Sequence, residues 1–170
     1  FMFDEKKDNN ILEKYKYQKN GEMVAYISYL DCIGVKGNAV RFSEQFKQFL
    51  DNILEITKNF CEKLTIHLIV RDLEDYKEMI DMLNEEPPTN LTISEDNNGT
   101  IITYNDKCTI KLYEGQLPKD KYNKLFESSI PVFVGSGANS IEEKIRSGFI
   151  TLGYTRGWDN HLMEEIIESF

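Results

Sequence analysis

Short apolar runs alternate along this chain with segments whose apolar residues recur every three or four positions. A continuous apolar run is typical of a strand buried on both faces of a sheet, whereas the longer spacing is typical of an amphipathic helix. The expected strands are residues 23–30, 64–70, 108–115, 130–137 and 149–154. The expected helices are residues 42–60, 73–83, 118–129, 140–147 and 159–169. This alternation predicts an α/β fold in which a parallel sheet carries helices on both faces.

One segment, residues 91–104, interrupts the alternation. It has two arms rich in β-branched residues around Asn98-Gly99, a pair that suits a tight type I′ turn, so we expect an inserted β-hairpin. Residues 1–22 are mostly polar and are expected to form a lead-in helix or linker. The chain has 170 residues in all, so residues 23–170 are expected to fold as a single domain.

Charge and composition exclude several classes of function. The chain has 20 Lys and Arg against 29 Asp and Glu, a formal net charge of −9, which disfavours non-specific binding of nucleic acid. No apolar run approaches the roughly 20 residues of a membrane helix, so no membrane span is expected. The three cysteines form no CxxC pair and favour a reducing, cytoplasmic compartment over a disulfide scaffold or a zinc site. Because the chain opens on Phe1, we expect it to be part of a longer protein.

A loop of small residues joins an expected buried strand to an expected helix. Its residues are Ser136, Gly137, Ala138, Asn139 and Ser140. The free N–H groups and the positive dipole end of a helix start make such a junction an anion site. Ser140 and Glu143 also have the S-x-x-E spacing of a capping box, which places the helix start at Ser140. A capped turn that binds no ligand is the alternative interpretation.

Two further loops follow expected strands. Ligands bind parallel sheets at the carboxyl ends of the strands, so these loops are candidates for the same crevice. The loop after the first strand contributes Gly34, Lys36, Gly37 and Arg41, whose two cations suit a diphosphate. The loop after the strand 108–115 contributes Gln116 and Leu117, whose backbone groups suit a planar base. Solvated surface cations are the alternative for Lys36 and Arg41.

Residues 132–152 resemble the donor-binding segment of GT-B glycosyltransferases. In both, a strand leads to a glycine loop, then to S-x-x-E, and then to a glycine five residues later, here Ser140, Glu143 and Gly148. The resemblance implies a Rossmann-like domain, half of a GT-B fold, that binds a nucleotide sugar as substrate with no metal or other cofactor. The loop from Ser136 would hold the donor diphosphate, and Glu143 the ribose or sugar. Asp159 and Asn160 would contact the sugar, and a separate N-terminal domain would bind the acceptor.

Other functions remain open beside this one. The glycine and glutamate pattern is also similar to that of the UDP-GlcNAc 2-epimerases, which share the GT-B architecture. A degenerate GT-B module that serves as a protein-interaction scaffold is a third possibility. No catalytic residue is identified, because the base would come from the acceptor half. His67 lies within an apolar strand and is expected to be a hydrogen-bonded core histidine rather than a base.

Overall fold

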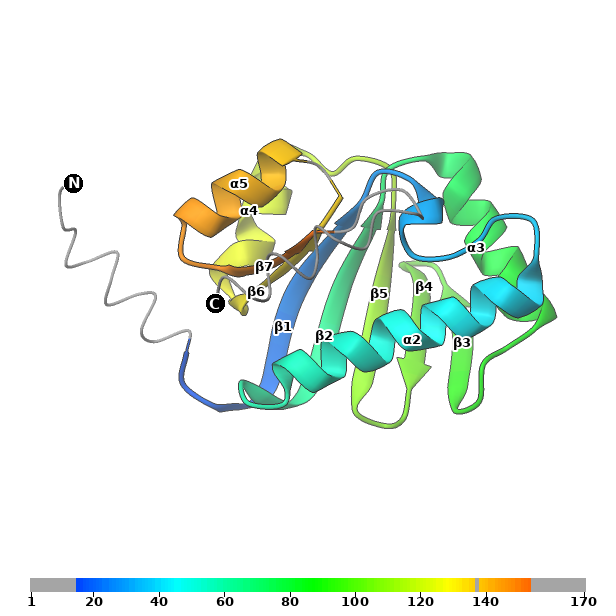
Figure 1. Cartoon of the computed structure of the whole chain (residues 1–170), viewed down its shortest axis with the longest axis horizontal. Helices are drawn as coiled ribbons and strands as arrows, with labels where there is room; N and C mark the ends of the chain where they lie inside the picture. The colour runs from blue at the N-terminus through cyan, green and yellow to red at the C-terminus, as the bar shows by residue number, and fades with distance from the viewer. Residues whose placement is uncertain (1–14, 137, 154–170) are drawn as a thin grey trace, which may run out of the picture.

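A computed structural model of the chain describes residues 15–136 and 138–153, which form a seven-stranded sheet flanked by helices (Figure 1). The predicted alternation of strands and helices is confirmed throughout these residues. The elements, in chain order, are β1 (Gln18–Ile27), the 3-10 helix η1 (Leu30–Cys32), α2 (Ala39–Thr57), β2 (Cys61–Val70), α3 (Leu73–Glu85), β3 (Leu91–Asp96), β4 (Gly99–Tyr104), β5 (Cys108–Glu114), α4 (Lys119–Glu127), β6 (Ser129–Gly135), α5 (Ala138–Arg146) and β7 (Ile150–Gly153). The last expected helix, residues 159–169, lies outside the described residues.

The strand order is β3-β4-β5-β2-β1-β6-β7. Five of these strands run parallel: β1 pairs with β2 and β6, β2 pairs with β5, and β6 pairs with β7. Taken in chain order, the parallel strands β5-β2-β1-β6-β7 are the third, second, first, fourth and fifth, which is the Rossmann order. The hairpin β3–β4 adds two antiparallel strands to the outer edge of β5. The fold is therefore α/β and Rossmann-like, with a mixed sheet.

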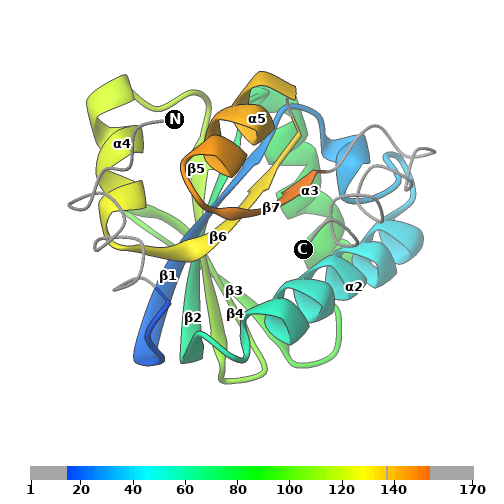
Figure 2. The ribbon, with the colours of Figure 1, turned by 60° about the vertical axis from the view of Figure 1, so that its left-hand side comes forward.

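Helices cover both faces of the sheet. On one face α2 and α3 bury a large apolar cluster that includes Phe42, Leu50 and Met79. On the other face Phe126 of α4 packs against Phe133 in a smaller cluster. Helix α5 lies on the same face as α4, because Lys144 Nζ lies 3.5 Å from the centroid of the Phe126 ring. Figure 2 shows α2 and α3 on one side of the strands and α4 on the other.

The hairpin turn differs from the predicted one. β3 ends at Asp96 and β4 begins at Gly99, so the exposed central residues are Asn97 and Asn98. Neither has the positive φ that a type I′ turn requires; only Gly99 does, at 125°. The Asp96 carboxylate instead accepts a hydrogen bond from the Asn98 backbone N–H at 2.7 Å, which stabilises an Asx turn. The hairpin itself is confirmed, but the predicted turn type is wrong.

Strand β1 begins earlier than its apolar run. Residues 18–22, expected in the lead-in segment, belong to the sheet and pair with β2. Four of these five residues are polar and not buried, and from Met23 onward the strand is almost wholly buried. A polar strand end carries no apolar signal, so the sequence pattern detects only the buried part.

Candidate functional site

The carboxyl ends of β1 and β6 lie side by side, with Tyr26 in register with Gly135. The helices that follow these two strands, α2 and α5, cover opposite faces of the sheet. Ligands of open α/β sheets bind in the crevice at such a switch point. Just beyond the two strand ends, the Ser28 backbone N–H donates a further hydrogen bond to Ser136 Oγ at 2.6 Å. Ser136 and the start of α5 therefore lie at the position where this fold places a ligand.

Helix α5 begins two residues before the predicted start. Its first residue is Ala138, so Ser140 lies inside the first turn and is not the N-cap; the predicted capping box is wrong. The first N–H groups of a helix have no acceptor within the helix, so the anion-binding potential of this start does not depend on that box. Gly137 and the side chains of Ala138, Asn139 and Ser140 lie outside what the structure describes.

Glu143 lies in the second turn of α5 and its side chain is exposed. Burial, and secondly the charge of Glu143, raise the pKa of Tyr122 to about 12. An exposed carboxylate in this position is available to a ligand. Asp159 and Asn160, the expected sugar contacts, lie outside the described residues.

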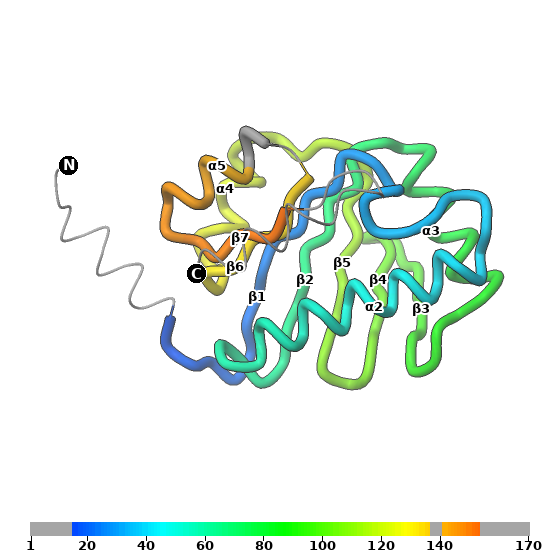
Figure 3. The backbone as a smooth tube through the Cα atoms, viewed as in Figure 1, coloured from blue at the N-terminus to red at the C-terminus, as the bar shows by residue number. Residues whose placement is uncertain are grey.

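The loop after β1 runs from the switch point to α3 (Figure 3). Lys36 Nζ lies 2.5 Å from Asp75 Oδ1, and this hydrogen bond raises the pKa of Lys36. The Gly37 backbone N–H donates to Glu78 Oε1 at 3.1 Å. The structure thus places Lys36 and Gly37 against α3, on the β2 side of β1, whereas the glycine loop lies on the β6 side. Arg41 is exposed in the first turn of α2.

Gly34 and Gly37 of this loop meet different structural requirements. A Cβ at Gly34 would lie 2.4 Å from Cδ2 of Phe42, a buried ring of α2. Gly37 has a φ of 77°, and a Cβ added there would meet no atom within 4 Å. Gly34 therefore serves close packing, and Gly37 serves a left-handed turn. Neither observation requires a ligand.

In the third predicted loop, which follows β5, one side chain is packed and one is exposed. Gly115 has a φ of 76°, and its N–H donates to the Val70 carbonyl oxygen at 2.9 Å. Leu117 packs against the apolar cluster beneath α4, whereas Gln116 is exposed. Of this pair, only Gln116 has a side chain available to a ligand from solution.

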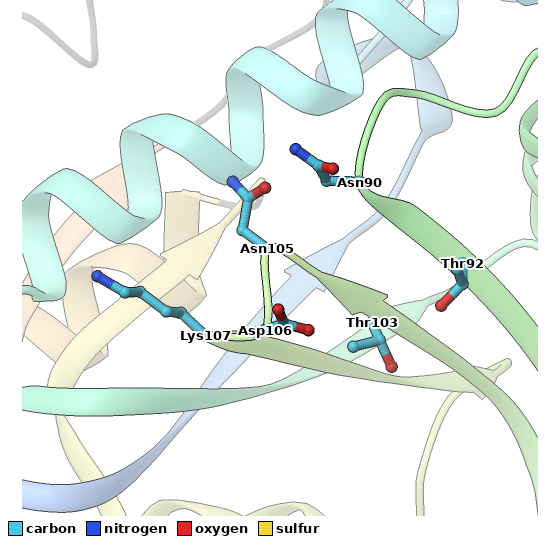
Figure 4. A pocket seen from close by; sticks show the side chains of 6 residues that line it. All are labelled: Asn90, Thr92, Thr103, Asn105, Asp106 and Lys107. Atoms are coloured by element: carbon cyan, nitrogen blue, oxygen red, sulfur yellow. The ribbon is translucent and has the colours of Figure 1, made fainter.

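A pocket of about 620 Å³ lies at the opposite edge of the sheet, where β5 begins (Figure 4). Its lining residues are Asn90, Thr92, Thr103, Asn105, Asp106 and Lys107. Asn90, Asn105 and Asp106 have φ values of 65°, 55° and 57°. Sequence reasoning missed this pocket, although Asn105-Asp106 is a recognisable turn signal for left-handed backbone. None of the predicted donor-site residues lines it.

A smaller pocket of about 350 Å³ lies between α3 and the hairpin. Four of its lining residues are acidic: Asp81, Glu95, Asp96 and Glu114. Within the described part of the chain, however, no group of three or more His, Cys, Asp or Glu side chains is arranged to hold a metal ion. This pocket also contains none of the predicted donor-site residues.

Among the helices of residues 15–136 and 138–153, none is long and apolar enough to cross a membrane.

Comparisons with known proteins leave the family open. No protein-family model matches the chain, and neither a curated protein nor a solved structure matches it.

Proposed function

We propose that the chain binds the diphosphate of a nucleotide sugar at the switch point between β1 and β6, as the donor half of a GT-B glycosyltransferase. The observation that carries this proposal is the contact of Ser28 with Ser136, which joins the ends of these two strands in a Rossmann-ordered sheet. The first turn of α5 begins two residues after Ser136 and supplies N–H groups for an anion.

Each proposed role follows from the chemistry of the residues. The amides of residues 138–140 stabilise the negative charge of the leaving diphosphate, in place of a metal ion. Glu143 accepts hydrogen bonds from ribose or sugar hydroxyls, and Asp159 and Asn160 contact the sugar. Because Lys36 is paired with Asp75, its main role is to hold the loop after β1. The exposed Arg41, in the first turn of α2, is the cation that we assign to the diphosphate.

The proposal also implies a partner and a compartment. An N-terminal domain of the GT-B pair binds the acceptor and supplies the catalytic base. This chain by itself therefore binds the donor without transferring the sugar. Cys32, Cys61 and Cys108 are all buried, which suits a reducing, cytoplasmic compartment.

A calorimetric titration tests the proposal. The panel contains uridine, adenosine and guanosine diphosphates and their sugar conjugates, each titrated up to about millimolar concentration. A dissociation constant of about 1 mM corresponds to a binding free energy of about 4 kcal/mol, so the titration detects even weak binding. We expect one base to bind measurably more tightly than the others. Absence of binding by every nucleotide would contradict the proposal and favour the scaffold alternative.

A further inference from the structure

Three polar side chains form a hydrogen-bonded chain across three neighbouring strands. His67 of β2 lies between Glu22 of β1 and Tyr113 of β5. His67 Nε2 lies 2.9 Å from Glu22 Oε1, and His67 Nδ1 lies 2.8 Å from Tyr113 Oη. His67 is 4% exposed, Tyr113 is half-buried, and Glu22 is accessible at the surface. The prediction of a buried, hydrogen-bonded histidine is confirmed, but its partners are a carboxylate and a phenol.

The donor and the acceptor of each hydrogen bond in this Tyr113–His67–Glu22 network follow from their chemistry. An ionised carboxylate only accepts hydrogen bonds, so Nε2 of His67 carries a proton and donates it to Glu22. In the neutral imidazole the other nitrogen, Nδ1, is then an acceptor, and the Tyr113 hydroxyl donates to it. The order phenol, imidazole, carboxylate is that of a nucleophile, a base and a group that orients the base.

The surroundings of Tyr113 favour an anionic reaction partner. Tyr113 is the penultimate residue of β5, and Lys121 Nζ lies 5.6 Å from the centroid of its ring. The exposed Lys111 precedes it by two residues and therefore lies on the same face of the sheet, in register with His67. Burial and the nearby Glu22 charge raise the pKa of Tyr113, so the phenol needs a base in order to react near neutral pH.

We propose that Tyr113 is a nucleophile, activated by His67 and Glu22, that accepts a phosphoryl group from a phosphate ester or anhydride. Tyr113 Oη attacks phosphorus, and the bond from phosphorus to the leaving-group oxygen breaks, with the electron pair staying on that oxygen. The phenolic proton passes to Nδ1 of His67, and the resulting imidazolium is stabilised by the Glu22 carboxylate. This inference uses none of the residues of the proposed donor site and does not rest on that function.

The test is covalent labelling of the whole chain, read by intact-protein and peptide mass spectrometry. The probes are 4-nitrophenyl phosphate and an aryl sulfonyl fluoride, which also transfers its group to activated phenols. We expect both probes to label Tyr113 preferentially. His67→Gln should slow labelling at Tyr113 by about a hundredfold, the usual contribution of a general base. Glu22→Gln should cause a smaller loss.

Matched variants separate this role from a purely structural one. Tyr113→Phe should abolish the label while keeping the ring, and Tyr122→Phe, which removes a half-buried phenol of α4, should leave the label at Tyr113 unchanged. Thermal melting of each variant shows whether it is folded, and Glu22→Gln keeps the test valid if His67→Gln does not fold. Absence of Tyr113 labelling by the phosphate probe, or equal rates in wild type and both His67 and Glu22 variants, would overturn the proposal.

Discussion

The Lys36 ammonium and the buried Asp75 carboxylate form an ion pair at 2.5 Å. The second oxygen of the same carboxylate accepts a hydrogen bond from the Leu30 backbone N–H at 2.9 Å. One side chain of α3 therefore anchors two points of the loop that leaves the switch point. This explains why the loop turns toward α3 and carries Lys36 with it.

Removing this anchor should destabilise the chain. Asp75→Ala leaves the buried Leu30 N–H without its acceptor, so we expect the free energy of unfolding to fall by about 1–3 kcal/mol. Glu78→Ala is the matched control, because Glu78 accepts a hydrogen bond from the exposed Gly37 N–H of the same loop, and its effect should stay within about 0.5 kcal/mol. Urea denaturation measures both variants. Equal losses would show that Asp75 has no special role in holding the loop.

The two glycines of the loop should respond differently to substitution. Gly34→Ala places a methyl group against the Phe42 ring and should cost about 1–3 kcal/mol through overpacking. Gly37→Asn should be tolerated much better, because asparagine readily adopts a left-handed backbone and the space around position 37 is open. Thermal melting compares the two variants with wild type. If Gly37→Asn lost as much stability as Gly34→Ala, the separate explanations for these glycines would fail.

Ionisation of Tyr104 should lower the free energy of unfolding at alkaline pH. This residue is 1% exposed and its hydroxyl donates to Asp51 Oδ1 at 2.7 Å. Burial, followed by the hydrogen bond to Asp51, raises the pKa of Tyr104 from 10.0 to about 12. The folded state therefore holds this proton where the unfolded state has lost it, so the contribution is complete below pH 10.0 and is lost as pH rises toward about 12.

The variant Tyr104→Phe isolates this effect from other groups. Between about pH 9 and about pH 11, wild type should lose about 1 kcal/mol more unfolding free energy than the variant. Cys108 and Tyr122 also have pKa values raised to about 12, but they are present in both proteins, so their own contributions largely cancel in the difference. Parallel pH dependences in urea denaturation would rule out a linkage through Tyr104.

Glu143 should matter for binding and not for folding. It lies inside α5 with an exposed side chain, so Glu143→Gln should leave the melting temperature nearly unchanged. If its carboxylate accepts hydrogen bonds from ribose or sugar hydroxyls, the amide should weaken nucleotide affinity by about ten- to a hundredfold. The control is the neighbouring Glu142→Gln, which removes an exposed ion pair with Arg146. Calorimetric titrations in which both variants bind like wild type would exclude Glu143 from the site.

The order of elements was predictable because buried parallel strands and amphipathic helices leave local patterns in a sequence. The side-chain contacts of the candidate site could not be predicted in this way. Lys36 looked available beside a glycine loop, and only the tertiary fold brings it to Asp75, 39 positions later in the chain, counting 75 − 36. In the same way the partners of His67 come from two other strands, so they depend on which strands pair in the sheet, and the segment around His67 does not reveal this.

A donor site at the switch point is tested most directly by an amide NMR titration of the chain with the best-binding nucleoside diphosphate of the panel. We expect the largest chemical-shift changes at Ser28, which follows β1, and at residues 136–141, which follow β6. No shift changes at about millimolar nucleotide, or changes centred on residues 90–107 at the opposite edge of the sheet, would contradict a donor site at the switch point.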